Sequence, residues 1–155
     1  MSDHRISAIT LADDGVVQRT RAIEQEREVA IYDLLESNSF RLEGSDGGPY
    51  ALTLRVEENR LIFDIADAAG EPAKVALSLT PFRTLIKDYF LVCESYYKAI
   101  RTAPPSQIEA LDMGRRGLHD EGAELLRTRL ADKVETDFST ARRLFTLLCV
   151  LHLRG

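Results

Sequence analysis

Apolar residues recur at every second position of three segments in the first half of the chain. In residues 50–56, 61–65 and 75–79, large apolar side chains alternate with mostly polar or small ones. A period of two places each set on one face of a β-strand. Turns through residues 57–59 and 69–72 would join the three strands. The pattern predicts an antiparallel meander with one buried face, which helices must cover.

The spacing changes to three and four residues in the segments that flank the meander. It predicts helices over residues 19–37, 81–101 and 136–152, and the last is apolar almost all round and therefore buried, either centrally or in a subunit interface. Thr80 would cap the second helix, with Pro81 in its first turn. The first helix carries one apolar stripe, made of Ile23, Ala30, Ile31, Leu34 and Leu35. We place three glutamates off that stripe: Glu24, Glu26 and Glu28.

A further helix is predicted to begin at residues 106–109, because their sequence, SQIE, has the pattern of a capping box. Glycines follow at Gly114, Gly117 and Gly122. Each weakens a helix by about 1 kcal/mol relative to alanine. We therefore expect a break or a kink within residues 113–122, with a helix resuming by Glu121.

Short strand candidates at residues 6–11 and 40–42 complete the order of strand, helix, meander and helices. We predict a single α+β domain over residues 1–155. Its expected architecture is an antiparallel β-meander of three to five strands covered by about four helices, with an all-helical C-terminal half. A length of 155 residues is sufficient for one domain with its own core.

Charge narrows the classes of function without naming one. The net charge is −5, which disfavours broad nonspecific binding to nucleic acid. The charge is uneven, because residues 1–100 hold 11 basic and 17 acidic residues while residues 101–155 hold 9 and 8. The C-terminal third is therefore the part of the chain that is suited to meet an anion.

The two cysteines, Cys93 and Cys149, lie among apolar residues and are interpreted as reduced, buried thiols. No apolar signal core follows the first residues, and the longest apolar run, of about ten residues, is half a bilayer span. We expect a cytoplasmic protein without a membrane partner that forms a homodimer or another homo-oligomer.

The sharpest local feature is Gly114-Arg115-Arg116-Gly117. Glycines let a backbone approach a ligand, and guanidinium groups bind carboxylate or phosphate with two hydrogen bonds. A GxxG turn between helices beside a three-stranded sheet resembles the KH module, which clamps a nucleic-acid backbone. Two other interpretations stay open: solvated or salt-bridged arginines on a kinked helix, and a contact with a protein or a carboxylate.

His119, Arg142 and Arg143 complete the set of candidate binding residues. The two arginines lie in the first turns of the last helix, where the helix dipole does not favour cations. They could pair with Asp137 or add positive charge beside Arg115 and the rest of the GRRG segment. A general-base role for His119 would need a nucleophile or an oxyanion site, and the sequence shows neither.

These observations favour a non-catalytic adaptor or regulator that acts through contacts with a protein partner or with itself. The first alternative is a small-molecule enzyme with its site around His119, Arg115 and Arg116. The second is nucleic-acid binding through the Gly114–Gly117 turn, a partner class that the acidic chain disfavours. We assign no catalytic residue, no metal ligand and no cofactor.

The segments from Gly114 to Leu126 and from Asp137 to His152 resemble an uncharacterised family of alphaproteobacterial proteins. The chain length and the early segment Ile6–Leu11 are also similar, so the resemblance covers nearly the whole chain. The resemblance implies a bacterial cytoplasmic protein of unknown function. It supplies no activity and no functional residues.

Overall fold

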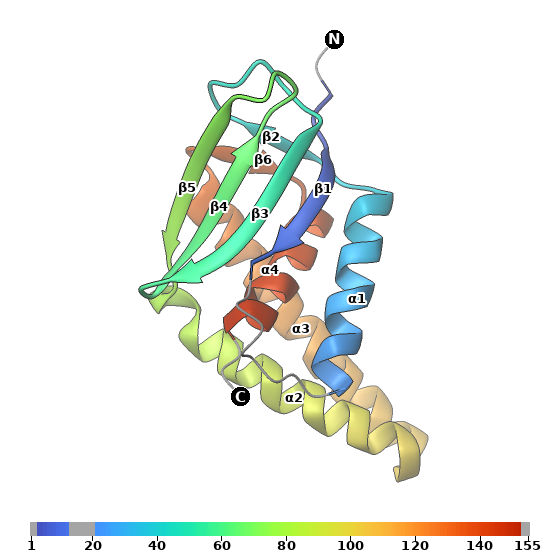
Figure 1. Cartoon of the computed structure of the whole chain (residues 1–155). Coiled ribbons are helices and arrows are strands. Elements are labelled where there is room, and N and C mark those ends of the chain that lie inside the picture. Colours follow the sequence, from blue (N-terminus) through green and yellow to red (C-terminus); the bar gives the residue numbers. More distant parts are fainter. Residues whose placement is uncertain (1–2, 13–20, 153–155) are drawn as a thin grey trace.

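The computed structural model describes residues 3–12 and 21–152, and the order of their elements is shown in Figure 1. The first half contains β1 (Ile6–Leu11), α1 (Arg21–Glu36), β2 (Phe40–Leu42), β3 (Tyr50–Glu57), β4 (Arg60–Ala66) and β5 (Pro72–Ser78). The second half contains a 3-10 turn (Thr80–Phe82), α2 (Arg83–Thr102), α3 (Pro105–Leu130), β6 (Val134–Thr136) and α4 (Phe138–His152). The α+β class is confirmed; the predicted start of the first helix at residue 19 lies outside the described residues.

The predicted meander is present as β3, β4 and β5, which pair antiparallel in sequence order. A fourth strand, β1, lies beside β3 and runs parallel to it, so the sheet is mixed. A parallel neighbour needs a crossover connection, and the segment that contains α1 supplies it. The sheet order β1-β3-β4-β5 gives four strands, within the predicted three to five.

A second, two-stranded sheet joins distant parts of the chain. β2 pairs antiparallel with β6, with Phe40 opposite Thr136 and Leu42 opposite Val134. The prediction of an all-helical C-terminal half is therefore wrong at β6, which lies between α3 and α4. Three residues are too few for alternation to be recognised, and only the pairing with β2 makes this segment a strand.

The helix α4 is buried, as its apolar sequence predicted, and it lies at the centre of the core. Ten of its fifteen residues are buried, from Thr140 through Leu151. In the view of Figure 1, α4 lies behind the four-stranded sheet, α1 stands to its right beside β1, and α2 crosses below it. In the described part of the chain, no helix combines the length and the apolar character needed to cross a membrane.

Of the break or kink predicted within residues 113–122, the break is wrong, because α3 runs without interruption from Pro105 to Leu130. A Cβ atom on Gly122 would lie 2.5 Å from carbons of the Phe145 ring, so this glycine lets α3 approach α4 closely. The GxxG turn on which the KH comparison depends is therefore absent from α3. Packing on both sides outweighs a helix penalty of about 1 kcal/mol per glycine.

Two predicted helix caps are also wrong. Pro104 precedes α3 and no side chain caps it, so the SQIE segment lies inside the helix without forming the box. The segment from Thr80 to Phe82 forms a 3-10 turn that follows Leu79 without a side-chain cap, and α2 begins only at Arg83. In both places a proline lies in the first turn, of the 3-10 turn and of α3, where it has no N–H that would need a partner.

Candidate functional site

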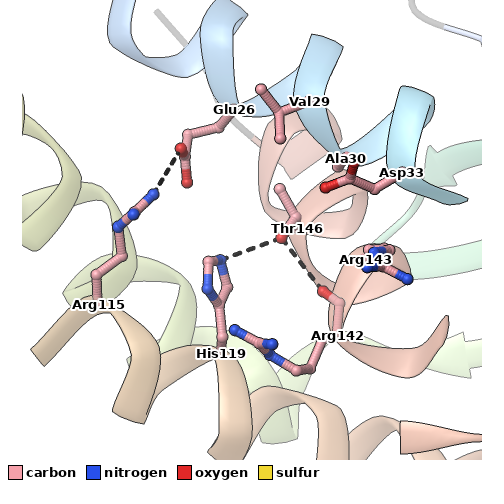
Figure 2. Close-up of a pocket in the computed structure, with 9 residues that line it drawn as sticks. All are labelled: Glu26, Val29, Ala30, Asp33, Arg115, His119, Arg142, Arg143 and Thr146. Carbon is pink, nitrogen blue, oxygen red and sulfur yellow. Dashed lines mark hydrogen bonds and ion pairs between the residues drawn. The ribbon is translucent and has the colours of Figure 1, made fainter. Parts of the chain in front are cut away.

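Four of the seven residues singled out in the sequence meet at one cleft, although two helices carry them. Arg115 and His119 come from α3, and Arg142 and Arg143 come from α4. The cleft has a volume of about 140 Å³. Figure 2 draws the remaining lining residues: Glu26, Val29, Ala30 and Asp33 from α1, and Thr146 from α4. We call this space the arginine cleft.

The other three candidates lie away from the arginine cleft. Arg116 points outward with 67% of its side chain exposed and pairs with Asp112 at 2.7 Å. A Cβ atom on Gly114 would meet only Val92 of α2, at 3.5 Å, and one on Gly117 would meet open space. Residues three or four apart share a helix face, so Arg115 and His119 turn inward together while Arg116 and Gly117 are exposed.

A buried carboxylate lies beside the arginine cleft, on Glu26, which is only 6% exposed. Its Oε1 accepts a hydrogen bond of 2.7 Å from the Tyr89 hydroxyl. Its Oε2 accepts one of 2.9 Å from the Tyr97 hydroxyl and one of 2.9 Å from Nη1 of Arg115. The Cys93 sulfur is 3.7 Å from Oε1. The charge of Glu26 is therefore fully engaged by donors, as a buried ion requires.

Arg115 is held between two carboxylates. Besides Glu26, its Nη2 donates a 2.8 Å hydrogen bond to Asp112, one turn earlier on α3. Its guanidinium carbon lies 4.5 Å from the centre of the Tyr96 ring, a cation–π contact. Burial lowers the pKa of Arg115, but the bond to Asp112 and the charge of Glu26 outweigh it and hold the pKa above its ordinary value. The hydrogen bond from Arg115 lowers the pKa of Asp112 in turn.

His119 is neutral in this environment. Burial, partly opposed by the charge of Glu26, lowers its pKa from 6.5 to about 4. Its Nε2 lies 3.2 Å from the Thr146 hydroxyl, which itself donates to the Arg142 carbonyl at 3.2 Å. The hydroxyl has one hydrogen, so we infer that Nε2–H of His119 donates to Thr146 and that Nδ1 is unprotonated. His119 thus orders the cleft wall and adds no charge.

Arg142 and Arg143 differ in how far their charges are satisfied. Nε of Arg142 is 3.4 Å from Asp120 and makes no hydrogen bond within the described chain, although that nitrogen is buried. Among the described residues, no carboxylate lies within ion-pair distance of the Arg143 guanidinium. Asp137, the pairing partner considered from sequence, instead accepts a hydrogen bond from the Thr140 amide at the start of α4. Of the two interpretations drawn from the sequence, added positive charge near Arg115 fits the structure better than pairing with Asp137.

The sequence interpretation missed Glu26. We placed it off the apolar stripe of α1, but it lies on the buried face with Ile23, Ala30 and Leu34. The spacing of three, four and four residues through these positions was a signal that could have placed it there. Its donors Tyr89 and Tyr97 lie eight residues apart on α2, a segment whose pairing with α1 no local pattern reveals.

The comparisons with known proteins agree on one group. Residues 3–154 match UPF0262, described as an uncharacterised protein family. A UPF0262 protein of Caulobacter vibrioides is 58% identical over 154 residues, which cover 99% of this chain and 96% of that protein. A UPF0262 protein of Nitrobacter winogradskyi is 56% identical over 155 residues, which cover 99% and 93%. No solved structure matches the chain.

Proposed function

We propose that this chain, which belongs to the uncharacterised protein family UPF0262, is a non-catalytic binding protein that docks an acidic group of a protein partner in the arginine cleft. The observation that supports this proposal is the charge of Arg143. It lines a cleft, and no carboxylate of the described chain lies within ion-pair distance of it. A guanidinium in such a place can bind a carboxylate with two parallel hydrogen bonds.

The size of the arginine cleft limits what it can take. Its volume of about 140 Å³ is below the roughly 300–1,000 Å³ of a typical small-molecule site. A single side-chain carboxylate fits this volume, and a nucleotide does not. Asp33 lies on the opposite, α1 side of the cleft and can accept a hydrogen bond from a peptide N–H that flanks the docked acid. A carboxylate carried by a peptide can bind Arg143 while the peptide N–H donates to Asp33.

Apolar residues beside the arginine cleft favour a macromolecular partner over a free ion. Val29 lines the cleft and is 45% exposed, and Tyr32 on the same helix is 66% exposed. Aromatic and arginine side chains are enriched at the centres of protein interfaces. An acidic side chain that enters the cleft would bring neighbouring apolar groups of the partner against α1.

The enzyme alternative around His119 receives less support from the geometry. The Thr146 hydroxyl is hydrogen-bonded to the His119 ring, and its proton is directed at the Arg142 carbonyl. Removing that proton would not produce an exposed nucleophile, because Thr146 is 5% exposed within α4. The arrangement therefore favours a structural role for this pair over acid–base chemistry.

We further propose that the protein works in a reducing cytoplasm and that it self-associates. The free, buried thiols of Cys93 and Cys149 fit a reducing compartment. The exposed apolar side chains of α1 offer a surface for a second copy. Light scattering after size-exclusion chromatography measures the mass, and a monomer at all concentrations would rule out self-association.

Quantitative affinity capture tests the docking proposal. The full chain, Arg143→Glu and Arg129→Glu are compared as baits in nuclease-treated bacterial extract, with bound proteins counted by mass spectrometry. Arg129 is exposed near the end of α3, outside the arginine cleft, and provides the matched charge reversal. We expect partners that the wild type and Arg129→Glu retain and Arg143→Glu loses. Equal capture by all three baits would show that the cleft is not the docking site.

A further inference from the structure

A second cavity, larger than the arginine cleft, opens between the first turns of α1 and the C-terminal half of α2. Its volume is about 820 Å³, within the roughly 300–1,000 Å³ typical of small-molecule sites. Arg115 lines both cavities, and Tyr96, Tyr97 and Ile100 line this one alone. We call it the tyrosine groove. The proposed docking of an acidic side chain does not use it.

Contacts with Glu26 and Arg115 fix the two tyrosine rings that line the tyrosine groove. The Tyr97 hydroxyl is fixed by its 2.9 Å hydrogen bond to the buried carboxylate of Glu26. The Tyr96 ring is covered on one face by the guanidinium of Arg115, at 4.5 Å. The two tyrosine rings meet edge to face with their centres 5.2 Å apart. Aromatic rings that are oriented in advance bind apolar groups with little loss of side-chain entropy.

The charges around the tyrosine groove are mostly positive. Arg21, Lys98 and Arg101 line it, together with the single acid Glu94. In the described part of the chain, none of these four side chains makes an ion pair. Ile100 lies between the cations of α2 and is 46% exposed. An apolar surface with surplus cations beside it is complementary to a ligand with an apolar body and a negative end.

We propose that the tyrosine groove binds an amphipathic organic anion, a small molecule with an aromatic or aliphatic body and one carboxylate. The body packs on Tyr96, Tyr97 and Ile100. The carboxylate lies toward Lys98 and Arg101, which supply hydrogen bonds that a neutral ligand cannot use fully. Volume and charge together favour this class over a second acidic side chain, which would leave most of the groove empty.

Three probes separate the contributions of the apolar body and the charge. The ¹⁵N-labelled full chain is titrated with 2-naphthoate, with the neutral 2-naphthalenemethanol and with acetate, and amide shifts are followed. We expect 2-naphthoate to shift signals of residues 21–25 and 94–102 and to bind about tenfold more tightly than either other probe. Equal affinity for the neutral probe, or shifts confined to residues 142–146, would overturn the proposal.

Charge reversals on α2 provide the matched comparison. Lys98→Glu with Arg101→Glu is expected to weaken 2-naphthoate binding about tenfold. Lys87→Glu with Arg129→Glu makes the same charge change at exposed positions outside the groove and leaves the affinity unchanged. Equal weakening by both double variants would indicate nonspecific attraction and would contradict a defined site.

Two further measurements distinguish small-molecule binding in the tyrosine groove from partner docking in the arginine cleft. Arg143→Glu is expected to leave 2-naphthoate affinity unchanged, because Arg143 does not line the tyrosine groove. If signals of residues 94–102 shift when the protein is diluted without any probe, a second copy of the chain covers the groove. That result would overturn the small-molecule proposal while leaving partner capture through the arginine cleft to its own test.

Discussion

Replacement of Glu26 by leucine should destabilise the protein by about 3–5 kcal/mol, although the change turns a buried charge into an apolar side chain. Glu26 is 6% exposed and accepts hydrogen bonds from Tyr89, Tyr97 and Arg115. The variant leaves the Tyr89 hydroxyl, on a residue 1% exposed, without its acceptor, which costs about 1–3 kcal/mol. Loss of a charge-assisted bond from Arg115 adds about 1.5–3 kcal/mol. Tyr97 is only partly buried and can turn its hydroxyl to water.

Urea unfolding followed by circular dichroism measures this change. For a slope of about 2 kcal/mol per molar urea, the midpoint should fall by about 2 M. Glu28→Leu is the control, because Glu28 is exposed on the same helix, and its effect should stay within about 0.5 kcal/mol. A midpoint for Glu26→Leu equal to that of Glu28→Leu would refute the assignment of Glu26 as the central acceptor.

A double-mutant cycle tests the pairing itself. Arg115→Met added to Glu26→Leu should cost less than the sum of the two single changes, because the double variant leaves no unpaired charge between α1 and α3. Strict additivity would mean that the two side chains do not interact in solution, whatever each contributes alone.

Three further predictions concern close packing, proton binding and thiol reactivity. Gly122→Ala should destabilise the protein by about 1–3 kcal/mol, because the new Cβ would lie 2.5 Å from the Phe145 ring. Gly117→Ala adds a Cβ in open space and should stabilise the protein by about 0.5–1 kcal/mol. Urea midpoints measure both changes, and a shift of both midpoints in the same direction would contradict the packing of α3 on Phe145. Because folding lowers the pKa of His119 from 6.5 to about 4, the unfolded chain binds the extra proton between these values. The contribution of His119 to the free energy of unfolding is therefore complete above pH 6.5 and is lost as the pH falls toward 4. Over that range the free energy of unfolding should change by at most about 1.4 kcal/mol per pH unit because of this residue. His119→Gln should remove that part of the pH dependence, which urea titrations at several pH values measure. Burial raises the pKa of the Cys93 thiol to about 12, so iodoacetamide should modify it only after unfolding, and rapid labelling of the native protein would contradict its burial.

The local patterns of the sequence predict the elements better than their partners. Alternation in residues 50–79 was sufficient for the meander, because antiparallel neighbours joined by short turns follow one another in the chain. The parallel position of β1 and the pairing of β2 with β6 depend on contacts between segments more than 40 residues apart. No period within either segment carries that information.

In the candidate site, too, local sequence patterns predict some residues, whereas others depend on contacts between distant segments. Arg115 and His119 share one helix face, and the sequence marked both, but only the packing of α3 on α4 brings Arg142 and Arg143 to them. Gly122 misled the prediction because a glycine that weakens an isolated helix also permits close approach to Phe145. Glu26 was detectable by its spacing on α1, whereas its two tyrosine donors were not.

We propose that Arg143 and the arginine cleft bind a peptide-borne carboxylate. The most direct measurement compares two acetylated, methylamidated residues, glutamate and glutamine, in amide-shift titrations of the ¹⁵N-labelled full chain. We expect only the glutamate compound to shift signals of residues 26–33 and 142–146. Arg143→Glu should abolish these shifts, and Arg129→Glu should preserve them. Equal shifts with the glutamine compound, or shifts that persist in Arg143→Glu, would contradict the proposal.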